Sequence, residues 1–488
     1  MAAITALIRH YLEYLSKPGM ILSVLGLVLP FILVAYFDTN PASPRKAVRI
    51  PGCLRLGLQS RSNLEDQFER RSLSNDGQPT VKALFTYPVK SCRGVELTAS
   101  EVQATGLNFD RLFTFAQLTS TSKQAEQTLG NASGVSEEWD HQWRFITQRE
   151  FPRLALLETE LWLPDPRNKP AIPAHKARSR SRLDAESSQS RSRSRSRGNT
   201  LELERGRKDS DAPEVTSWVA NGGCLLLRFP FEPDINPFGI RTETVTLQIP
   251  LVPTPQRQEA QNYKREELII WKGCPLALNV TNEISAINLE KLKYFLGISN
   301  PLALFRVDEH SLRPVSRCLP QGTPAGTYKV GFADAFAVNL MSLASVRATD
   351  DELPDEADAK SKLDARRFRA NIYVTGIQAF EEDHWKTIHL GHQINGHSFS
   401  ASSTTAEYQV ACRTARCKVP NVNPDTGEKD RNEPYTTLGR TRKVDEGAYP
   451  HPCLGMQMIP RFRTGIVQVG DTISVSETGE HCCEKMFK

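Results

Sequence analysis

The sequence has little of what defines several common protein classes. Its 10 cysteines are too sparse among 488 residues for a disulfide-bonded scaffold, which favours free thiols in a reducing compartment. A formal net charge of +5 is small for this length, so no nucleic-acid partner is expected. No GxGxxG motif opens a βαβ unit and no phosphate-binding P-loop occurs, so nothing indicates a bound NAD, flavin or ATP.

One long apolar run lies near the N-terminus, where residues 20–37 read MILSVLGLVLPFILVAYF without a charge. As a helix this run would span roughly 27 Å, about the thickness of one hydrocarbon core. We therefore predict a membrane-anchor helix at 20–37 within an N-terminal segment 1–37. A cleaved signal peptide is the alternative, but no small-x-small cleavage site follows the run cleanly. Basic residues soon after the run place the body of the chain in the cytosol: Arg45, Lys46, Arg49 and Arg55.

The rest of the chain has the pattern of a β-rich α+β protein. From residue 80 onward, short runs of strand length recur between turn signals, and helical patterns occur at 279–297 and 336–348. The predicted strands are 81–90, 110–118, 153–163, 224–231, 242–251, 266–271, 371–377 and 466–476, and a helix is predicted to start at 380–385. The predicted divisions are a linker at 38–79, a first domain at 80–308, a second domain at 309–478 and a tail at 479–488.

Two polar insertions interrupt this pattern. Residues 119–140 are predicted to be a long loop, and residues 164–213 a disordered insert. The second contains the Arg/Ser tracts Ser179–Arg182 and Arg191–Arg197, whose serines would form a switchable charged segment when phosphorylated. A tolerated loop insert explains these tracts without a partner, because no RNA-binding aromatic motif accompanies them. An interaction module is the alternative.

Candidate chemistry lies in residues 411–438, which read ACRTARCKVPNVNPDTGEKDRNEPYTTL. Arg416 precedes Cys417, and a guanidinium beside a thiol favours the thiolate, which is the form that attacks electrophiles and binds soft metals. The NPDTG sequence that follows is a strong turn signal, so a thiolate here is well placed to line a pocket. From the spacing alone, a buried structural cysteine is an equally good interpretation.

Four motifs occur in one order along the chain: YPVKSCRG at Tyr87–Gly94, DRLF at Asp110–Phe113, FRANIYV at Phe368–Val374 and RCKVPNVNPDTG at Arg416–Gly427. Together with a VGD at Val469–Asp471 and the N-terminal apolar run, this order resembles the MOSC-domain proteins. The subgroup it resembles most is the membrane-anchored mitochondrial amidoxime-reducing components and their fungal relatives. The resemblance implies a MOSC N-terminal β domain packed on a MOSC β-barrel, with a molybdenum cofactor in the cleft between them.

The resemblance also assigns residues to that cofactor. Cys417 matches the thiolate that ligates molybdenum and is therefore both the predicted metal ligand and the predicted catalytic residue. Lys90, Ser91 and Arg111 match residues that hold the pterin and its phosphate, for which a cation and a hydroxyl are suitable donors. Without the joint pattern, Lys90 and Arg111 would be ordinary surface charges.

Four further residues complete the predicted cofactor site. Arg369, Asn371 and Arg416 match contacts to the polar edge of the pterin, and Asp334 lies in a segment whose main chain lines the pocket. Arg369 and Asn371 alone could equally be a strand-edge pair. The chain departs from the family pattern at a few positions, which affects substrate shape and redox tuning: Ala335, Phe336, Ala415 and the segment Leu454–Met458.

The function that the resemblance implies is a molybdenum-dependent oxidoreductase that reduces small N-hydroxylated compounds. Its relatives take electrons from cytochrome b5, which is itself reduced by an NADH-dependent reductase. The resemblance also implies a location at the mitochondrial outer membrane, with the catalytic part facing the cytosol. A molybdenum cofactor carrier or sulfur-transfer protein is one alternative, although the pyridoxal-phosphate domain of the cofactor sulfurases is absent from the sequence. A non-enzymatic, membrane-tethered interaction protein acting through the Arg/Ser tracts is the other.

Overall fold

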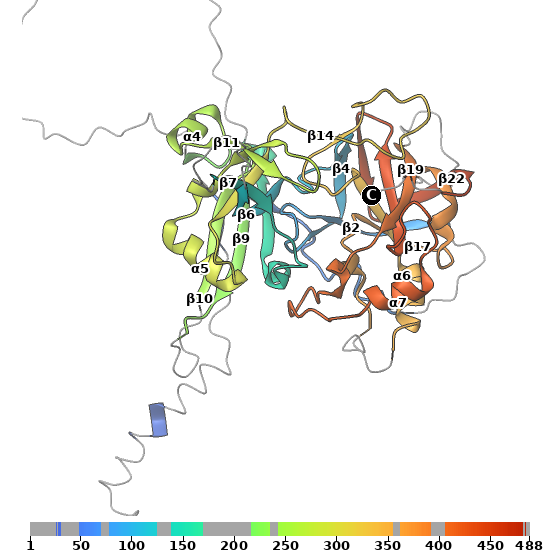
Figure 1. The fold of residues 1–488 in the computed structure, drawn as a ribbon, viewed down its shortest axis with the longest axis horizontal. Coiled ribbons are helices and arrows are strands. Elements are labelled where there is room, and N and C mark those ends of the chain that lie inside the picture. Colours follow the sequence, from blue (N-terminus) through green and yellow to red (C-terminus); the bar gives the residue numbers. More distant parts are fainter. Residues whose placement is uncertain are drawn as a thin grey trace, which may run out of the picture.

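The computed structural model describes two lobes built mainly of β-strands (Figure 1). The described residues are 26, 28–30, 48–69, 78–123, 138–168, 216–234, 243–354, 362–391, 406–481 and 484. Closed sheets dominate and helices are few and short, so the β-rich fold class predicted from the sequence is confirmed.

The first lobe combines a four-stranded antiparallel sheet, ordered β1-β8-β9-β10, with a closed barrel, ordered β11-β12-β13-β6-β7. β9 contributes Leu225, Leu227 and Phe229 to a core that also includes residues of helix α5. This helix starts after Ser285, whose side chain accepts a backbone N–H, and stops at Gly297 in the left-handed conformation. The elements are β1 (Cys53–Leu56), β6 (Phe113–Lys123), β7 (Glu138–Phe145), η1 (Pro152–Leu156), β8 (Glu158–Pro164), η2 (Pro166–Asn168), β9 (Cys224–Phe231), β10 (Glu243–Pro250), α4 (Pro255–Ala260), β11 (Lys264–Ile269), β12 (Leu276–Asn279), η4 (Thr281–Glu283), α5 (Ala286–Leu296) and β13 (Leu302–Val307).

The second lobe is a large sheet that closes on itself. Its order is β17-β16-β20-β19-β18-β22-β2-β3, and β2 pairs with β17 as well as with β22. Two smaller sheets, β21-β4-β5 and β14-β15, complete the described strands. The elements are β2 (Thr80–Thr86), β3 (Val95–Leu97), β4 (Ala99–Gln103), β5 (Gly106–Leu107), β14 (Arg313–Pro314), β15 (Lys329–Val330), β16 (Val338–Ser342), α6 (Leu343–Asp351), η6 (Ala365–Phe368), β17 (Ile372–Thr375), η7 (Glu381–His384), β18 (Trp385–Gly391), β19 (Ala406–Ala415), η8 (Val419–Asn421), α7 (Tyr435–Thr441), β20 (Cys453–Pro460), β21 (Thr464–Gln468) and β22 (Thr472–Thr478).

The second lobe includes strands from near the start of the folded part of the chain, β2 to β5. By sequence, β2 to β5 belong to the predicted first domain, 80–308, but β2 pairs with β17 and β4 pairs with β21. Figure 1 shows the blue strands β2 and β4 beside the orange and red strands of the second lobe. Leu84 and Leu97 accordingly pack in one core with Ile372 and Met456. The predicted boundary at 308/309 divides the sequence, whereas the second lobe needs strands from both sides of it.

The predicted linker at 38–79 is described at 48–69 and 78–79, and the structure departs from the prediction at 48–69. β1 lies in this segment and pairs with β8 of the first lobe. Leu64 is 1% exposed and belongs to a core cluster of the second lobe, and the Gln67 side chain accepts a hydrogen bond from Ala365 N at 2.8 Å. The segment therefore packs against both lobes, but only through a few residues. Because these contacts are few, no apolar periodicity marks the segment in the sequence.

Other elements also differ from the sequence-based predictions. The predicted loop at 119–140 begins and ends as strand, because β6 and β7 pair up to Lys123↔Glu138. The predicted helix at 336–348 is strand β16 followed by α6, and all five residues of β16 are buried. Residues 381–384 form a single 3-10 turn, and the predicted last strand is two strands, β21 and β22.

Three predicted segments fall largely outside the described residues. Of the predicted anchor helix at 20–37, only residues 26 and 28–30 are described; within the part of the chain that the structure describes, no helix is long and apolar enough to cross a membrane. The Arg/Ser tracts of the insert at 164–213 lie wholly outside it. Of the tail at 479–488, residues 479–481 and 484 are described, and His481 is buried and hydrogen bonded to Trp385 O at 2.7 Å.

Candidate functional site

The structure brings five of the predicted site residues together. Lys90 follows β2, and its buried ammonium group donates to Phe332 O at 2.9 Å and pairs with the Asp334 carboxylate. Arg111 precedes β6 and donates to Arg369 O at 3.1 Å. Arg369 in turn donates to Cys92 O at 2.7 Å, next to Ser91. Segments far apart in the sequence thus converge on one polar cluster.

Two guanidinium groups of this cluster share one aromatic ring. The Cζ atoms of Arg369 and Arg111 lie 4.4 and 4.7 Å from the ring centroid of Tyr87, whose hydroxyl donates to Ala370 O at 3.2 Å. Burial lowers the pKa of Arg369, and the nearby Arg111 charge lowers it further. The Arg369 Nη2 atom is buried without a hydrogen-bond partner among the described residues. An anion would stabilise this arrangement, because it would neutralise the two guanidinium charges and accept a hydrogen bond from Arg369 Nη2.

The backbone of the cluster is strained. Ser91, Arg111 and Arg369 have φ of +66°, +47° and +55°, and the neighbouring Trp271 has +54°. These four are among eight non-glycine residues with positive φ in the described chain. Non-glycine residues adopt the left-handed region at a cost, and such strain concentrates at functional sites. Because three predicted site residues carry it, the backbone supports a functional site independently of the side chains.

Asp334 lies at the open side of the cluster. Trp271 Nε1 donates to its Oδ1 atom at 3.0 Å, on the same carboxylate that pairs with Lys90. The side chain is 66% exposed, so the solvent reaches this carboxylate although its neighbours crowd it. Crowding by itself raises the pKa of Asp334, but the Lys90 ammonium outweighs it and holds that pKa well below the ordinary value. The Asp334 carboxylate is therefore ion-paired with Lys90 and still accessible to solvent.

Arg416 and Asn371 are buried behind this surface. The Arg416 guanidinium donates to Leu454 O at 2.7 Å and to Phe368 O at 2.9 Å. Asn371 accepts from Asn339 N at 3.1 Å and donates to Phe85 O at 3.2 Å. Burial lowers the pKa of Arg416 to about 10. Both side chains therefore bind main-chain groups of the second lobe, and their most direct effect is to position the segments that carry the other site residues.

Cys417 lies between β19 and η8 and is half-buried, and it is a free thiol like the other described cysteines. A negative charge on Cys417 or on Asp334 would raise the pKa of Arg416, against the larger effect of burial. Burial raises the pKa of Tyr435, and a charge on Cys417 raises it further. The Arg416 guanidinium therefore lies within electrostatic range of both Cys417 and Asp334, and Cys417 lies near Tyr435.

Sequence reasoning missed three residues around Cys417 and the cluster: Tyr435, His451 and Trp271. The Tyr435 hydroxyl and His451 Nδ1 are 3.1 Å apart, and burial together with the Arg149 charge lowers the pKa of His451. The Arg149 guanidinium lies 5.0 Å from the Trp271 ring. Trp271 occupies a tight turn in which Ile270 and Gly273 exchange backbone hydrogen bonds. A Gly two residues after Trp271 was the available signal for that turn.

Matches to known sequence families agree with this architecture. Residues 78–221 match the MOSC N-terminal beta barrel domain, and residues 327–474 match the MOSC domain. Both domains are therefore present in this chain, in the order that the four motifs predicted. The chain is a MOSC-domain protein, and the predicted residues that cluster come from both domains.

Among curated proteins, the chain resembles mitochondrial amidoxime-reducing components. It is 28% identical over 165 residues to mitochondrial amidoxime reducing component 2 of Rattus norvegicus, covering 33% of this chain and 43% of that protein. It is 27% identical over 187 residues to component 1 of Xenopus laevis, covering 38% and 49%. It is 37% identical over 118 residues to component 2 of Homo sapiens, covering 24% and 30%. The matches span less than half the length of these relatives.

Proposed function

We propose that this protein is a molybdenum-cofactor-dependent oxidoreductase that reduces N-hydroxylated compounds. The observation that carries the proposal is the Lys90–Arg111–Arg369 cluster, which holds a buried unpartnered Arg369 donor. The half-buried thiol of Cys417 follows Arg416, whose guanidinium lies within electrostatic range of both Cys417 and Asp334. The MOSC domains and the amidoxime-reducing relatives support the same assignment.

The residues present fit the molybdenum cofactor. Its phosphate is an anion, and Arg369 Nη2 together with the Arg111 guanidinium offers cationic donors around Tyr87. Ser91, which is buried beside Lys90 in the chain, offers a hydroxyl as a further donor. Cys417 offers a soft sulfur ligand, which suits molybdenum better than an oxygen ligand would.

When bound, the cofactor supplies two electrons for cleaving the N–O bond of the substrate. The overall reaction converts an N-hydroxyl compound, two electrons and two protons into the reduced nitrogen compound and water. The chain's own residues then bind and orient: Lys90, Arg111 and Arg369 neutralise the anion, while Trp271 and Arg149 form an aromatic and cationic rim for a small polar substrate. Electrons come from a cytochrome b5-type haem protein reduced by an NADH-dependent reductase.

The membrane anchor at 20–37 and a location at the mitochondrial outer membrane, with the catalytic part in the cytosol, belong to the same proposal. The curated relatives are mitochondrial by name, and the uncharged apolar run is long enough to span a bilayer.

Replacing Cys417 with Ala tests the proposal. Reduction of an amidoxime with an artificial electron donor is expected to fall at least about a hundredfold, because the variant lacks the only proposed protein ligand of the metal. Cys274→Ala, at an exposed free cysteine, is the matched control and is expected to keep full activity. Full activity and full molybdenum content in Cys417→Ala would refute the role of this residue.

A further inference from the structure

The turn that follows Cys417, residues 423–429, contacts the first lobe although it belongs to the second. Lys429 Nζ donates to Arg149 O at 2.6 Å. Gly427 has φ of +70°, and a Cβ atom placed there would lie 3.0 Å from Leu156 Cδ1. A residue without a side chain, free to adopt this conformation, therefore lets the turn approach η1 of the first lobe.

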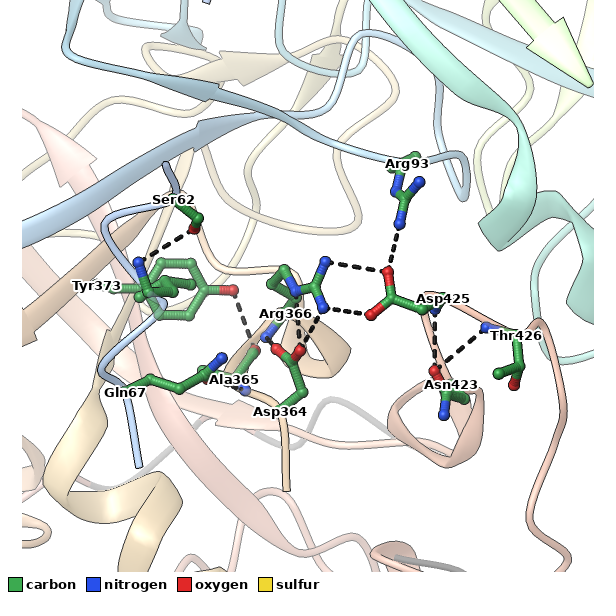
Figure 2. Close-up of polar contacts among 11 residues, drawn as sticks. Ser62, Gln67, Arg93, Asp364, Ala365, Arg366, Tyr373, Asn423, Asp425 and Thr426 are labelled. Atoms are coloured by element: carbon green, nitrogen blue, oxygen red, sulfur yellow. Dashed lines mark hydrogen bonds and ion pairs between the residues drawn. The ribbon is translucent and has the colours of Figure 1, made fainter. Parts of the chain in front are cut away.

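The strongest contacts of this turn pass through Asp425 (Figure 2). Its carboxylate pairs with Arg93, and Arg366 donates to its two oxygens at 3.2 and 2.5 Å. Arg366 is itself held by Asp364, which accepts its Nε at 2.8 Å and caps η6. Figure 2 shows Arg366 lying between the two carboxylates, with Arg93 approaching Asp425 from the other side.

Each partner of Asp425 is fixed on a segment that carries predicted site residues. Arg93 follows Ser91 by two positions, and its main chain is bound to the first lobe through Leu157 O at 3.1 Å and Thr159 Oγ1 at 2.6 Å. Arg366 lies in η6, which ends at Arg369. Asp425 lies eight positions after Cys417. One carboxylate therefore joins the three segments on which the site is built.

We propose that Asp425 is a positioning residue that latches the Cys417 segment to both lobes and so controls access to the Cys417 thiol. The side chains of Arg93, Arg366 and Asp425 are 34%, 30% and 50% exposed, so added salt screens the latch. Release of the turn frees the segment between Cys417 and Asp425, and the thiol becomes more reactive. The inference depends on the proposed function only in treating Cys417 as a site residue.

The test measures site-resolved labelling of cysteines by a thiol reagent in the full chain, made in a host without the molybdenum cofactor. In Asp425→Asn, which keeps the size of the side chain, the labelling rate of Cys417 is expected to rise at least about threefold at low salt. The wild-type rate should rise with salt toward that of the variant, whose own rate should change little. Asp425→Glu is expected to restore slow labelling. The matched control is Glu243→Gln in β10, which removes the ion pair with Lys291. Glu243 is about as exposed as Asp425 and lies far from Cys417 in the sequence.

The buried thiols of Cys412 and Cys453 report global opening in the same molecules. Faster labelling of Cys417 alone supports the latch. Unchanged labelling of Cys417 in Asp425→Asn, or labelling that rises equally at Cys412 and Cys453, overturns it. The labelling readout needs no metal, so the two proposals can fail separately. If Asp425→Asn speeds labelling of Cys417 but the protein never takes up molybdenum, the latch is supported and only the proposed function is refuted.

Discussion

At the scale of single residues, the site depends on cations that the fold holds close together. Arg111 and Arg369 face one ring, that of Tyr87, and Lys90 is buried beside them. Such an arrangement costs free energy unless counter-charges compensate, and the chain itself supplies Asp110 and Asp334 as partners. Arg369 Nη2 is buried without a hydrogen-bond partner among the described residues, so it remains available as a donor to an anion.

A second residue-scale feature predicts how stability depends on pH. Glu382 is 0% exposed, Ser345 Oγ donates to it at 2.7 Å, and burial raises the pKa of Glu382 to about 7. The folded protein thus binds this proton more tightly than the unfolded chain does. The stabilisation is complete at low pH, below the ordinary pKa of a glutamate, and is lost as the pH rises through about 7. Each unit by which folding raises the pKa corresponds to about 1.4 kcal/mol of folding free energy.

Glu382→Gln should therefore flatten the loss of stability between pH 5 and pH 8, as measured by urea unfolding at about these two values. Glu381→Gln, at the exposed neighbouring carboxylate, is the control and should keep the wild-type pH dependence. Identical pH dependence in Glu382→Gln and wild type would show that Glu382 keeps an ordinary affinity for its proton.

Sequence reasoning reached part of this site for a specific reason. Lys90, Arg111 and Arg369 lie within contiguous motifs and could be found from those motifs. Trp271 could not be found, because its contribution depends on a left-handed turn that brings the indole to Asp334, 63 positions away. The position of Arg416 beside Cys417 could be seen in the sequence, but not that its guanidinium donates to the carbonyl groups of Leu454 and Phe368.

At the scale of elements, burial on all sides hides the strand signal. The predicted helix at 336–348 contains β16, whose five residues are all buried, so no alternation of polar and apolar residues marks it as a strand. Of the helix predicted at 279–297, only residues 286–296 form α5, which has a capping residue at each end. The residues before it belong to β12 and the 3-10 turn η4. Gly455 in β20 illustrates a further limit: a Cβ there would meet Leu340 O at 2.7 Å, a contact invisible in sequence.

The segment 48–69 leads to an element-scale prediction about stability. A chain that starts at residue 80 loses the pairing of β1 with β8 and the burial of Leu64 against the second lobe. Compared with a chain that starts at residue 48, its free energy of unfolding should be lower by at least about 2 to 5 kcal/mol, the range for one emptied leucine site. Denaturant unfolding of the two chains measures the difference.

Leu64→Ala in the longer chain separates the two contributions, since it empties the core site and leaves β1 paired. It should reproduce a part of the loss. Equal unfolding midpoints for the chains that start at residues 48 and 80 would contradict a structural role for this segment.

At the scale of the whole molecule, the two lobes are interdependent. β2 to β5 start the body of the chain and finish the second lobe, while the turn at 423–429 leaves the second lobe and contacts the first. The order of motifs predicted two domains, and both are present. It could not predict that strands cross between them, because pairing of distant strands depends on backbone hydrogen bonds that any residue can make.

This arrangement explains why the site residues come from distant parts of the sequence. Lys90 follows β2 of the second lobe, and Arg111 lies between β5 of the second lobe and β6 of the first. Asp334 precedes β16, and Cys417 follows β19. The site forms only when both lobes are folded and joined, so a cofactor bound there should in turn stabilise the joined state.

The measurement that tests the central claim most directly is the molybdenum and pterin content of the full chain purified from a cofactor-competent host. The account predicts about one molybdenum and one pterin per chain, with both reduced in Arg369→Ala, which removes the unpartnered buried donor. Repeated preparations of folded wild-type protein that contain neither metal nor pterin would contradict the account.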